Sequence, residues 1–212
     1  MKDNLRHVGL RNQLVEQLAQ KGIKDKNVLK AIAKVPRHWF LDSTFENFAY
    51  QDKAFPIGAN QTISQPYTVA FQTELLELKK GEKVLEVGTG SGYQTAVLYH
   101  MGVKVYSIER QKELYNKTSL FLPKIGVRVK FFFGDGYKGQ PKFAPYDKIL
   151  VTAGAPQMPK VLLAQLKVGG TMVIPIGDKE QVMMKLIRKN ETQFEKSTHG
   201  LFRFVPLLRD KN

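Results

Sequence analysis

The sequence contains no cysteine, and this absence excludes several kinds of chemistry at once. Disulfide bonds, cysteine-ligated zinc and cysteine nucleophiles all need a thiol, so none of them is available to this chain. Long apolar runs are missing too. No stretch approaches the ~18 residues of a membrane span, and the residues after Met1 are too polar for a signal peptide. We therefore expect a cytoplasmic protein without membrane association, and we predict no metal site.

Acidic residues are scarce beside basic ones. The chain has 19 Asp and Glu against 33 Lys and Arg, which gives a formal net charge of +14. A surplus of this size is typical of proteins that bind nucleic acid or another anionic partner. The basic residues are spread along the chain, however, and the densest stretch, residues 21–34, is interrupted by apolar residues at helical spacing. A solvated basic surface is the simpler interpretation, with attraction of acidic substrates as the alternative.

The first 50 residues differ in pattern from the rest and predict a helical extension. Leu10, Leu14 and Leu18 recur every four residues, which places them on one face of a helix. Asp25 is a suitable N-cap for a second helix, which would end near Pro36. The length of 212 residues suits a single domain over 1–212. In this domain residues 1–50 extend a core of residues 80–212, and residues 51–68, which are polar and small, predict a loop.

The core alternates short apolar runs with helix-length segments. Strands are expected at residues 84–87, 103–108, 127–133, 149–151 and 172–176, and helices at residues 68–78, 93–101, 111–122 and 159–166. Such alternation builds right-handed βαβ units and hence a doubly wound parallel sheet. Two further strands, at residues 182–188 and 201–205, are expected to add antiparallel edge strands. The predicted fold class is therefore α/β, with a Rossmann-like seven-stranded sheet.

A glycine-rich turn follows the first core strand, where residues 86–93 have the sequence EVGTGSGY. Glycines allow a sharp turn and a close approach of a ligand to the backbone, and the helix that follows offers free N–H groups. A dinucleotide-binding loop would have its third glycine at position 93, where this chain has Tyr93. Glu86 precedes the loop, and a carboxylate suits an ammonium or a ribose hydroxyl better than a pyrophosphate. Glu86, Gly88 and Gly90 are therefore predicted to bind a cofactor without phosphate.

Two further acidic residues end the next two strands. Glu109 lies about 20 residues beyond the glycine turn, the distance at which a ribose-binding carboxylate falls in a βαβ nucleotide site. Asp135 is placed to accept a hydrogen bond from an adenine amino group, and Gly136 would let the base approach; a simple turn aspartate is the alternative. Three acidic strand ends in order describe a cofactor with an amine, a ribose and an adenine. S-adenosylmethionine fits that description.

Several segments together resemble the protein L-isoaspartate (D-aspartate) O-methyltransferases. Residues 60–67 (NQTISQPY) lie upstream of the glycine loop, and this combination is the most specific part of the resemblance. Similarity is also found at residues 134–137 (GDGY), 144–147 (APYD), 151–156 (VTAGAP) and 174–177 (IPIG), and it extends from the N-terminal helices to residues 205–207. The family commonly has alanine where this chain has Gly154.

The resemblance implies a class I methyltransferase sheet with an altered order of its last strands, and it implies roles for particular residues. Ser64 is the expected catalytic residue. Thr152, Ala153 and Gly154 are expected beside the substrate backbone. The cofactor contacts implied by the resemblance are Gln61, Thr62, Ile63, Ser64, Tyr67, Glu109, Arg110, Gly136, Tyr137 and Gln181.

The activity implied by the resemblance is methylation of the carboxylate of L-isoaspartyl, and of D-aspartyl, residues in damaged proteins, which begins their repair through a succinimide. An isoaspartyl carboxylate is already ionised at neutral pH, so its methylation needs no strong general base. Catalysis would come from positioning and desolvation. The Ser64 hydroxyl would hold one carboxylate oxygen while the other attacks; the alternative role for Ser64 is a cap on the helix that follows. The expected partners are proteins and peptides that contain isoaspartate, and the expected state is a monomer.

A nucleic-acid methyltransferase is the alternative function, because the net charge is +14. Amino-methylating DNA enzymes of this fold carry an Asp/Asn-Pro-Pro-Tyr-like stretch after the fourth strand, where this chain has residues 151–156. Methylation of a base at C5 needs a cysteine nucleophile, which the chain lacks. A non-enzymatic nucleotide-binding module would have no use for residues 61–67. We therefore expect no nucleic-acid partner.

Overall fold

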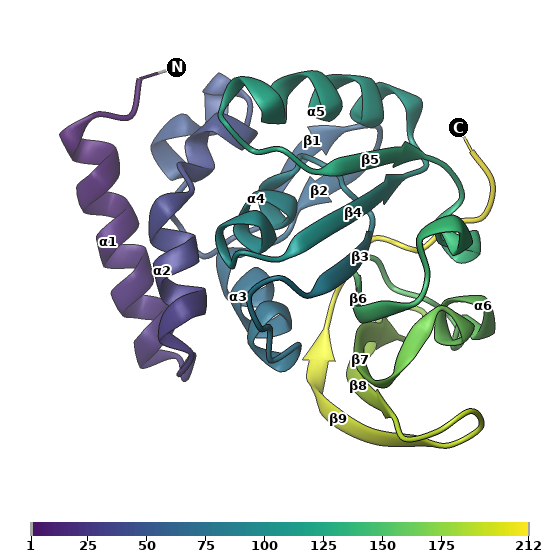
Figure 1. Cartoon of the computed structure of the whole chain (residues 1–212). Coiled ribbons are helices and arrows are strands. Elements are labelled where there is room, and N and C mark those ends of the chain that lie inside the picture. Colours follow the sequence, from purple (N-terminus) through teal and green to yellow (C-terminus); the bar gives the residue numbers. More distant parts are fainter. Residues whose placement is uncertain (1, 212) are drawn as a thin grey trace.

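The structure is a computed structural model that describes residues 2–211, with a seven-stranded sheet at its centre (Figure 1). The N-terminal extension is helical, as the sequence predicts. Leu14 and Leu18 are buried on one face of its first helix, and Asp25 caps the second by accepting a hydrogen bond from the Asn27 N–H. The extension comprises α1 (Leu5–Gln20), α2 (Lys26–Lys34) and the 3₁₀ helices η1 (Arg37–Phe40) and η2 (Ser43–Phe48).

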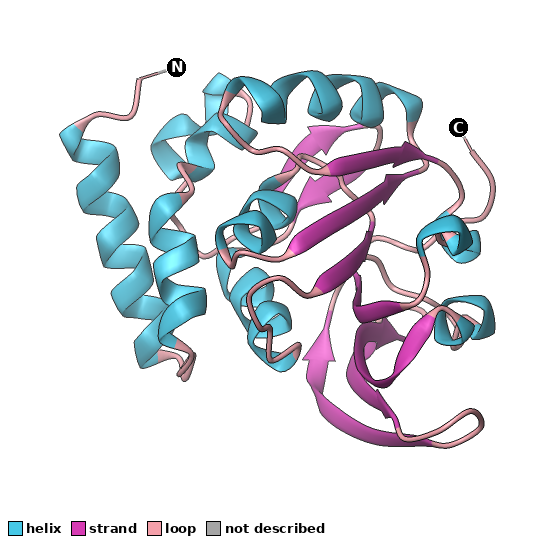
Figure 2. Cartoon of the chain, viewed as in Figure 1, coloured by secondary structure: helices cyan, strands magenta, loops and turns pink. Residues whose placement is uncertain are grey.

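The central sheet has the order β5-β4-β3-β6-β7-β8-β9. Strands β3 to β7 run parallel, whereas β8 is antiparallel to β7 and β9 is antiparallel to β8. The α/β class and the antiparallel edge strand expected at residues 182–188 are thereby confirmed (Figure 2). The second edge strand was expected at residues 201–205, and that position is wrong, because the strand begins at Phe194 and ends at Phe202. The strands are β3 (Lys83–Val87), β4 (Lys104–Glu109), β5 (Lys130–Phe133), β6 (Tyr146–Val151), β7 (Leu166–Ile176), β8 (Gln181–Arg188) and β9 (Phe194–Phe202). The helices that alternate with them are α3 (Pro66–Leu75), α4 (Tyr93–His100), α5 (Lys112–Lys124), η3 (Gly136–Lys138), η4 (Pro141–Phe143) and α6 (Lys160–Ala164).

Residues 51–68 were expected to form a loop, and that prediction is wrong. They contain a small antiparallel hairpin of β1 (Phe55–Gly58) and β2 (Gln61–Ile63), followed by the start of α3. The hairpin turns through Ala59 and Asn60, both of which have positive φ. Strands of four and three residues are too short to show the alternation by which a strand is recognised in a sequence.

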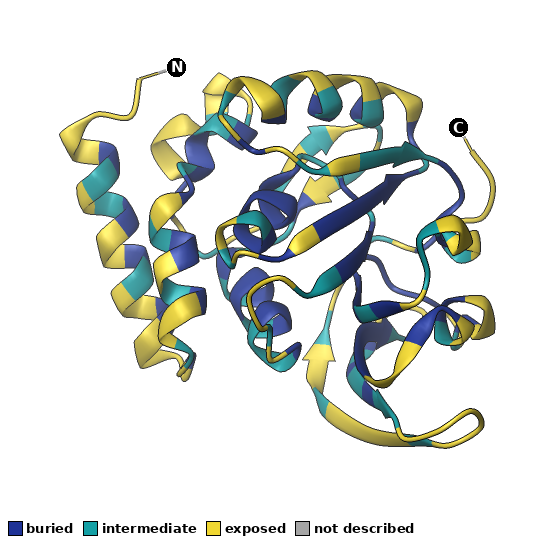
Figure 3. Cartoon of the chain, in the orientation of Figure 1, coloured by how far each residue is buried: buried dark blue, intermediate teal, exposed yellow. Residues whose placement is uncertain are grey.

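The two faces of the sheet are covered by different parts of the chain. On one face Val84 packs with Leu76 and Leu98 from the α3 and α4 side, and α2 contacts both helices from outside. On the other face Leu85 packs with Leu162 of α6 and with Leu207 near the C-terminus. Figure 3 shows β3 and β4 buried between these layers, while β9 is largely exposed.

The last strand returns the chain to the carboxyl edge of the parallel strands. Because β8 and β9 are each antiparallel to their predecessor, β9 points in the same direction as β7. The segment after β9 then crosses the strand ends, where the Gly154 N–H donates to the Val205 carbonyl (2.8 Å) and the Leu207 N–H donates to the Gly154 carbonyl (2.7 Å). Within residues 2–211, no helix combines the length and the apolar character that crossing a bilayer requires.

Candidate active site

A first cavity opens at the carboxyl edge of the sheet, where β3, β4 and β6 end. Most of its walls come from residues 61–64, residues 87–91, residues 108–111 and the C-terminal residues 205–208. Binding at strand ends beside a glycine turn is the usual arrangement in open α/β sheets. The predicted site residues that line this cavity are Gln61, Thr62, Ile63, Ser64, Gly88, Gly90, Glu109, Arg110, Gly136, Thr152 and Ala153.

The floor of the first cavity is the glycine turn. Gly88 has a φ of +99°, and a Cβ built there would lie 2.4 Å from Thr152 Oγ1. The same Thr152 hydroxyl donates to the Gly88 carbonyl at 2.7 Å. This bond ties the end of β3 to the end of β6. Glycine at position 88 therefore lets the backbone itself form the floor, with no side chain in the space above it.

Glu109, a predicted cofactor ligand, has a fixed orientation in the first cavity. Its carboxylate is held by two backbone groups: Oε2 accepts from the Gly90 N–H (2.9 Å) and Oε1 from the Gln111 N–H (2.8 Å). The side chain is only 5% exposed, yet it lines the cavity. A carboxylate has about four lone-pair sites, so each oxygen retains capacity for one hydroxyl. This preset orientation suits the two hydroxyls of a ribose.

Glu86 does not reach the first cavity. Its side chain is completely buried on the α4 side of the sheet, where Oε2 accepts hydrogen bonds from Thr95 Oγ1 and Ser107 Oγ, both at 2.6 Å. Oε1 has no hydrogen-bond partner among the described residues. Burial raises the pKa of Glu86 to about 7, although the two hydroxyl bonds oppose the shift. The structure thus places Glu86 beneath the glycine turn, in support of it, rather than against a ligand.

Ser64 lies where the first cavity meets a second one. The second cavity, of about 580 Å³, is bordered by α3 and by the end of β9, and Ser64, Thr62 and Thr152 line both. Helix α3 begins at Pro66, and its N-cap is Gln65, which makes no side-chain capping bond. The alternative role of Ser64 as a helix cap is therefore wrong. A serine at the junction of two cavities is suitably placed to act on a group that reaches from one into the other.

Four predicted cofactor ligands lie elsewhere. Tyr67 lines the second cavity, not the first. Asp135 and Tyr137 line a third cavity, and Asp135 Oδ1 accepts from the Tyr137 N–H at 2.8 Å, which is the turn arrangement considered as the alternative. Gln181 is 1% exposed and accepts a hydrogen bond from the Phe204 N–H. These residues lie near the predicted edge of the sheet, but none of the four is among the residues that line the first cavity.

The predicted substrate-contacting segment is divided by the structure. Thr152 and Ala153 line the first cavity. Gly154 lies behind its wall, because its N–H and its carbonyl are both bonded to the segment after β9. A Cβ at Gly154 would lie 2.8 Å from the Gln181 side chain. The alanine that the family commonly has here would require that side chain to move, so the direct substrate contact predicted for Gly154 lacks structural support.

Several residues that line the first cavity were given no role from the sequence. Tyr93 and Gln94 lie at the start of α4, and the Gln94 Oε1 atom is buried without a partner among the described residues. Arg37, fully buried, lies over the Tyr93 ring at 4.6 Å. The C-terminal residues 205–208 close the opposite wall. The resemblance extends to residues 205–207, which was the available signal, but nothing in their residue types indicates a ligand.

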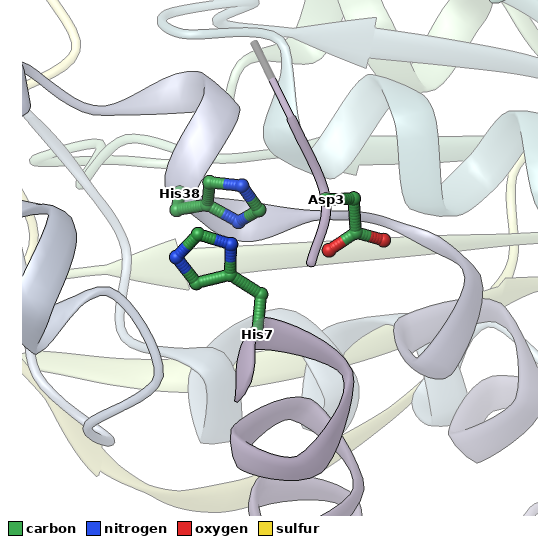
Figure 4. Close-up of side chains that lie close together, drawn as sticks. All are labelled: Asp3, His7 and His38. Carbon is green, nitrogen blue, oxygen red and sulfur yellow. The ribbon is translucent and has the colours of Figure 1, made fainter. Parts of the chain in front are cut away.

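A group of potential metal ligands, Asp3, His7 and His38, lies in the N-terminal extension (Figure 4). Its geometry is that of an ion pair beside stacked rings. Arg11 occupies both carboxylate oxygens of Asp3, at 3.0 and 2.8 Å. The two imidazoles stack with their centroids 3.8 Å apart. His38 also bonds Tyr50 at 2.8 Å. These contacts fix the N-terminal segment to η1, and none of the three residues lines the first cavity.

The site and the fold together define a class: a methyltransferase that uses S-adenosylmethionine. Three features support this class: the strand order of the sheet, a glycine turn without a phosphate-binding third glycine, and a carboxylate oriented to suit a ribose. A family model described as protein-L-isoaspartate(D-aspartate) O-methyltransferase matches residues 10–212. The chain belongs to this family.

Individual relatives agree with the family match. A protein-L-isoaspartate O-methyltransferase of Flavobacterium psychrophilum is 68% identical over 100% of both chains. A solved protein-L-isoaspartate O-methyltransferase has a TM-score of 0.84 and 31% identity, and the match covers 92% of this chain and 65% of that one. A Plasmodium falciparum structure described under the same activity, in complex with S-adenosyl-L-homocysteine, has a TM-score of 0.83 and 26% identity over 94% of this chain and 99% of that one.

Proposed function

We propose that this chain transfers the methyl group of S-adenosylmethionine to the free carboxylate of L-isoaspartyl residues in damaged proteins, and that D-aspartyl residues are a second substrate. The observation that carries the proposal is the position of Ser64 at the junction of the two cavities. The first cavity has the features of the cofactor site, and the second is open to a peptide. Residues 1–212 act as one domain in this proposal.

The groups of the first cavity fit this cofactor. Glu109 offers a fixed pair of oxygens to a diol, and Gln94 offers a buried acceptor, Oε1, that no described residue bonds. The turn at Gly88 brings bare backbone to the cavity floor. Of the residues that line the cavity, Arg110 alone is cationic, so there is no cluster of charge for a pyrophosphate. A cofactor with a ribose and a sulfonium, but no phosphate, satisfies these groups.

The residues of the chain then act by positioning. When bound, S-adenosylmethionine supplies an electrophilic methyl group on a sulfonium. The Ser64 hydroxyl donates to one oxygen of the substrate carboxylate and leaves the other oxygen free to attack that methyl carbon. Transfer of the methyl group to that oxygen would form a methyl ester, and the cofactor would leave as S-adenosylhomocysteine. No proton has to be removed because the carboxylate is ionised at neutral pH. Thr152 and Ala153 border the same space.

Paired peptides test the proposal. Two peptides of the same sequence, one with an isoaspartyl and one with an aspartyl linkage, are incubated with the enzyme and labelled cofactor. We expect methylation of the isoaspartyl peptide alone, because the extra main-chain methylene changes where the carboxylate lies, and ~1 Å of misplacement costs on the order of 100-fold in rate. Equal methylation of both peptides would refute the proposed substrate.

We further propose that the enzyme acts as a cytoplasmic monomer and does not modify nucleic acid. The motif after the fourth core strand, residues 151–156, supports the last point, because it is unlike the Asp/Asn-Pro-Pro-Tyr stretch of amino-methylating DNA enzymes. Offering transfer RNA and duplex DNA as substrates in the same assay tests whether nucleic acid is methylated. Methyl incorporation into either nucleic acid without incorporation into the isoaspartyl peptide would favour the alternative.

A further inference from the structure

The second cavity has one wall made of aromatic side chains. Tyr67 and Phe71 stand one turn apart on α3, with ring centroids 5.7 Å apart and planes 19° from parallel. Phe202, at the end of β9, continues the stack at 5.5 Å from Phe71 and 25°. We call these three residues the aromatic row. All three line the second cavity and are half-buried, with one side packed against the core and the remainder facing the cavity. Lys21 Nζ, which is paired with Asp52, lies 5.9 Å from the Tyr67 ring centroid.

The aromatic row is continuous with the proposed site of methyl transfer. Ser64 lies just before α3 and Tyr67 lies in its first turn, and both line the second cavity. A peptide whose isoaspartyl carboxylate reaches Ser64 must therefore pass its neighbouring residues through this space. The second cavity, at about 580 Å³, has room for a large side chain.

The second cavity carries little net charge, despite the basic character of the chain. Its charged lining residues are Arg203 and Glu180, and these two pair with each other at 2.8 Å. His199 lies against Phe71 with its ring centroid 6.5 Å away, and its Nε2 atom is bonded to Ser197 Oγ. The surroundings of the aromatic row thus offer an incoming peptide more apolar surface than attraction for acidic residues.

We propose that the aromatic row is a specificity subsite that selects peptides with a large apolar, preferably aromatic, residue next to the isoaspartyl residue. The inference rests on the proposed function, since it assigns the occupant of the second cavity as the substrate peptide. Offset stacking on the half-exposed rings and burial of apolar surface stabilise that neighbour. An acidic neighbour has no unpaired cation in the lining to meet it.

A peptide series on the unaltered enzyme gives the first test. The peptides share one isoaspartyl core and carry Phe, Leu, Ala or Glu at the position before or after it. We expect KM for the Phe peptide to be roughly tenfold lower than for the Ala peptide, with Leu between them and Glu no better than Ala. If none of the isoaspartyl peptides is methylated, the proposed function itself fails. If all are methylated with equal KM, or if Glu is preferred, only the subsite is refuted.

Variants of β9 give the second test. Phe202→Ala should raise KM for the Phe peptide towards the value for the Ala peptide, and Phe202→Leu should recover part of the difference. Phe194→Ala removes the same side chain from the other end of β9, outside the second cavity, and should leave the preference intact. Melting curves of each variant identify a loss due to unfolding. If the enzyme shows no preference among the peptides, and if it is a dimer that Phe202→Ala dissociates, the aromatic row serves self-association and the subsite is refuted.

Discussion

Replacement of the buried carboxyl group of Glu86 by an amide should change how the stability of the protein depends on pH. Glu86 is completely buried, and burial raises its pKa from 4.5 to about 7. The folded protein therefore holds a proton on Glu86 over a range in which the unfolded chain has released it. Stability that is present below pH 4.5 is lost as the pH rises to about 7.

The size of this loss follows from the shift. One pKa unit corresponds to ~1.4 kcal/mol, so a rise from 4.5 to about 7 corresponds to a loss of about 3 kcal/mol in the free energy of unfolding. Glu86→Gln has no proton to lose. The amide oxygen can take the place of Oε2 and accept from Thr95 and Ser107. The free energy of unfolding of Glu86→Gln, relative to that of the unaltered protein, should therefore increase by about 3 kcal/mol as the pH rises from 4.5 to about 7.

Urea unfolding at a series of pH values measures the effect. The quantity of interest is the difference in free energy of unfolding between Glu86→Gln and the unaltered protein, because the titration of all other groups cancels in it. Altered hydrogen bonds in the variant would add a constant to this difference at every pH, whereas the loss of the Glu86 proton changes the difference with pH. Glu16→Gln, which removes an exposed carboxylate from α1, controls for the loss of one negative charge. A difference that stays constant between pH 4.5 and 7 would refute the reasoning.

Three further predictions concern the first cavity. Glu109→Ala should weaken S-adenosylhomocysteine binding by about 10- to 100-fold in a folded protein, because a charge-assisted contact of ~1.5–3 kcal/mol is lost; calorimetry showing unchanged affinity would remove Glu109 from the site. Ser64→Ala should lower turnover more than cofactor affinity or Tm, since Ser64 caps no helix; kinetics and melting curves on one preparation decide. Gly88→Ala should abolish cofactor binding by displacing Thr152. Gly22→Ala, with similar φ but open space around it, should lower the free energy of unfolding by only about 1 kcal/mol and leave cofactor binding intact; equal losses of cofactor binding in the two variants would contradict the steric argument.

Regular alternation made most of the fold predictable from the sequence. The core strands are largely buried apolar runs, and α4 and α5 between them are long enough to identify. The hairpin at β1 and β2 was not predicted because its strands have only four and three residues, and its turn runs through Gly58, Ala59 and Asn60, all with positive φ. A strand of that length carries too few positions for a pattern, and its formation depends on the rest of the chain.

The site was predicted as a location more accurately than as a set of contacts. The acidic strand ends do gather at one edge, but side chains alternate along a strand. Glu86 therefore shares the α4 face with Val84, while Val87 faces the opposite side. Glu109 turns inwards because two backbone amides hold it. Gln181 is bonded to Phe204, a contact between two distant parts of the chain that no local motif indicates.

The direction of β9 has a consequence for the synthesis of the protein. The first cavity is assembled from residues as far apart as Gln61 and Leu208, because β9 delivers the end of the chain to the strand edge where the glycine turn lies. A nascent chain that has formed β3 to β7 still lacks one wall of this cavity. Tight cofactor capture thus becomes possible only when nearly all 212 residues have left the ribosome, so the cofactor can stabilise the finished fold but cannot template its early stages.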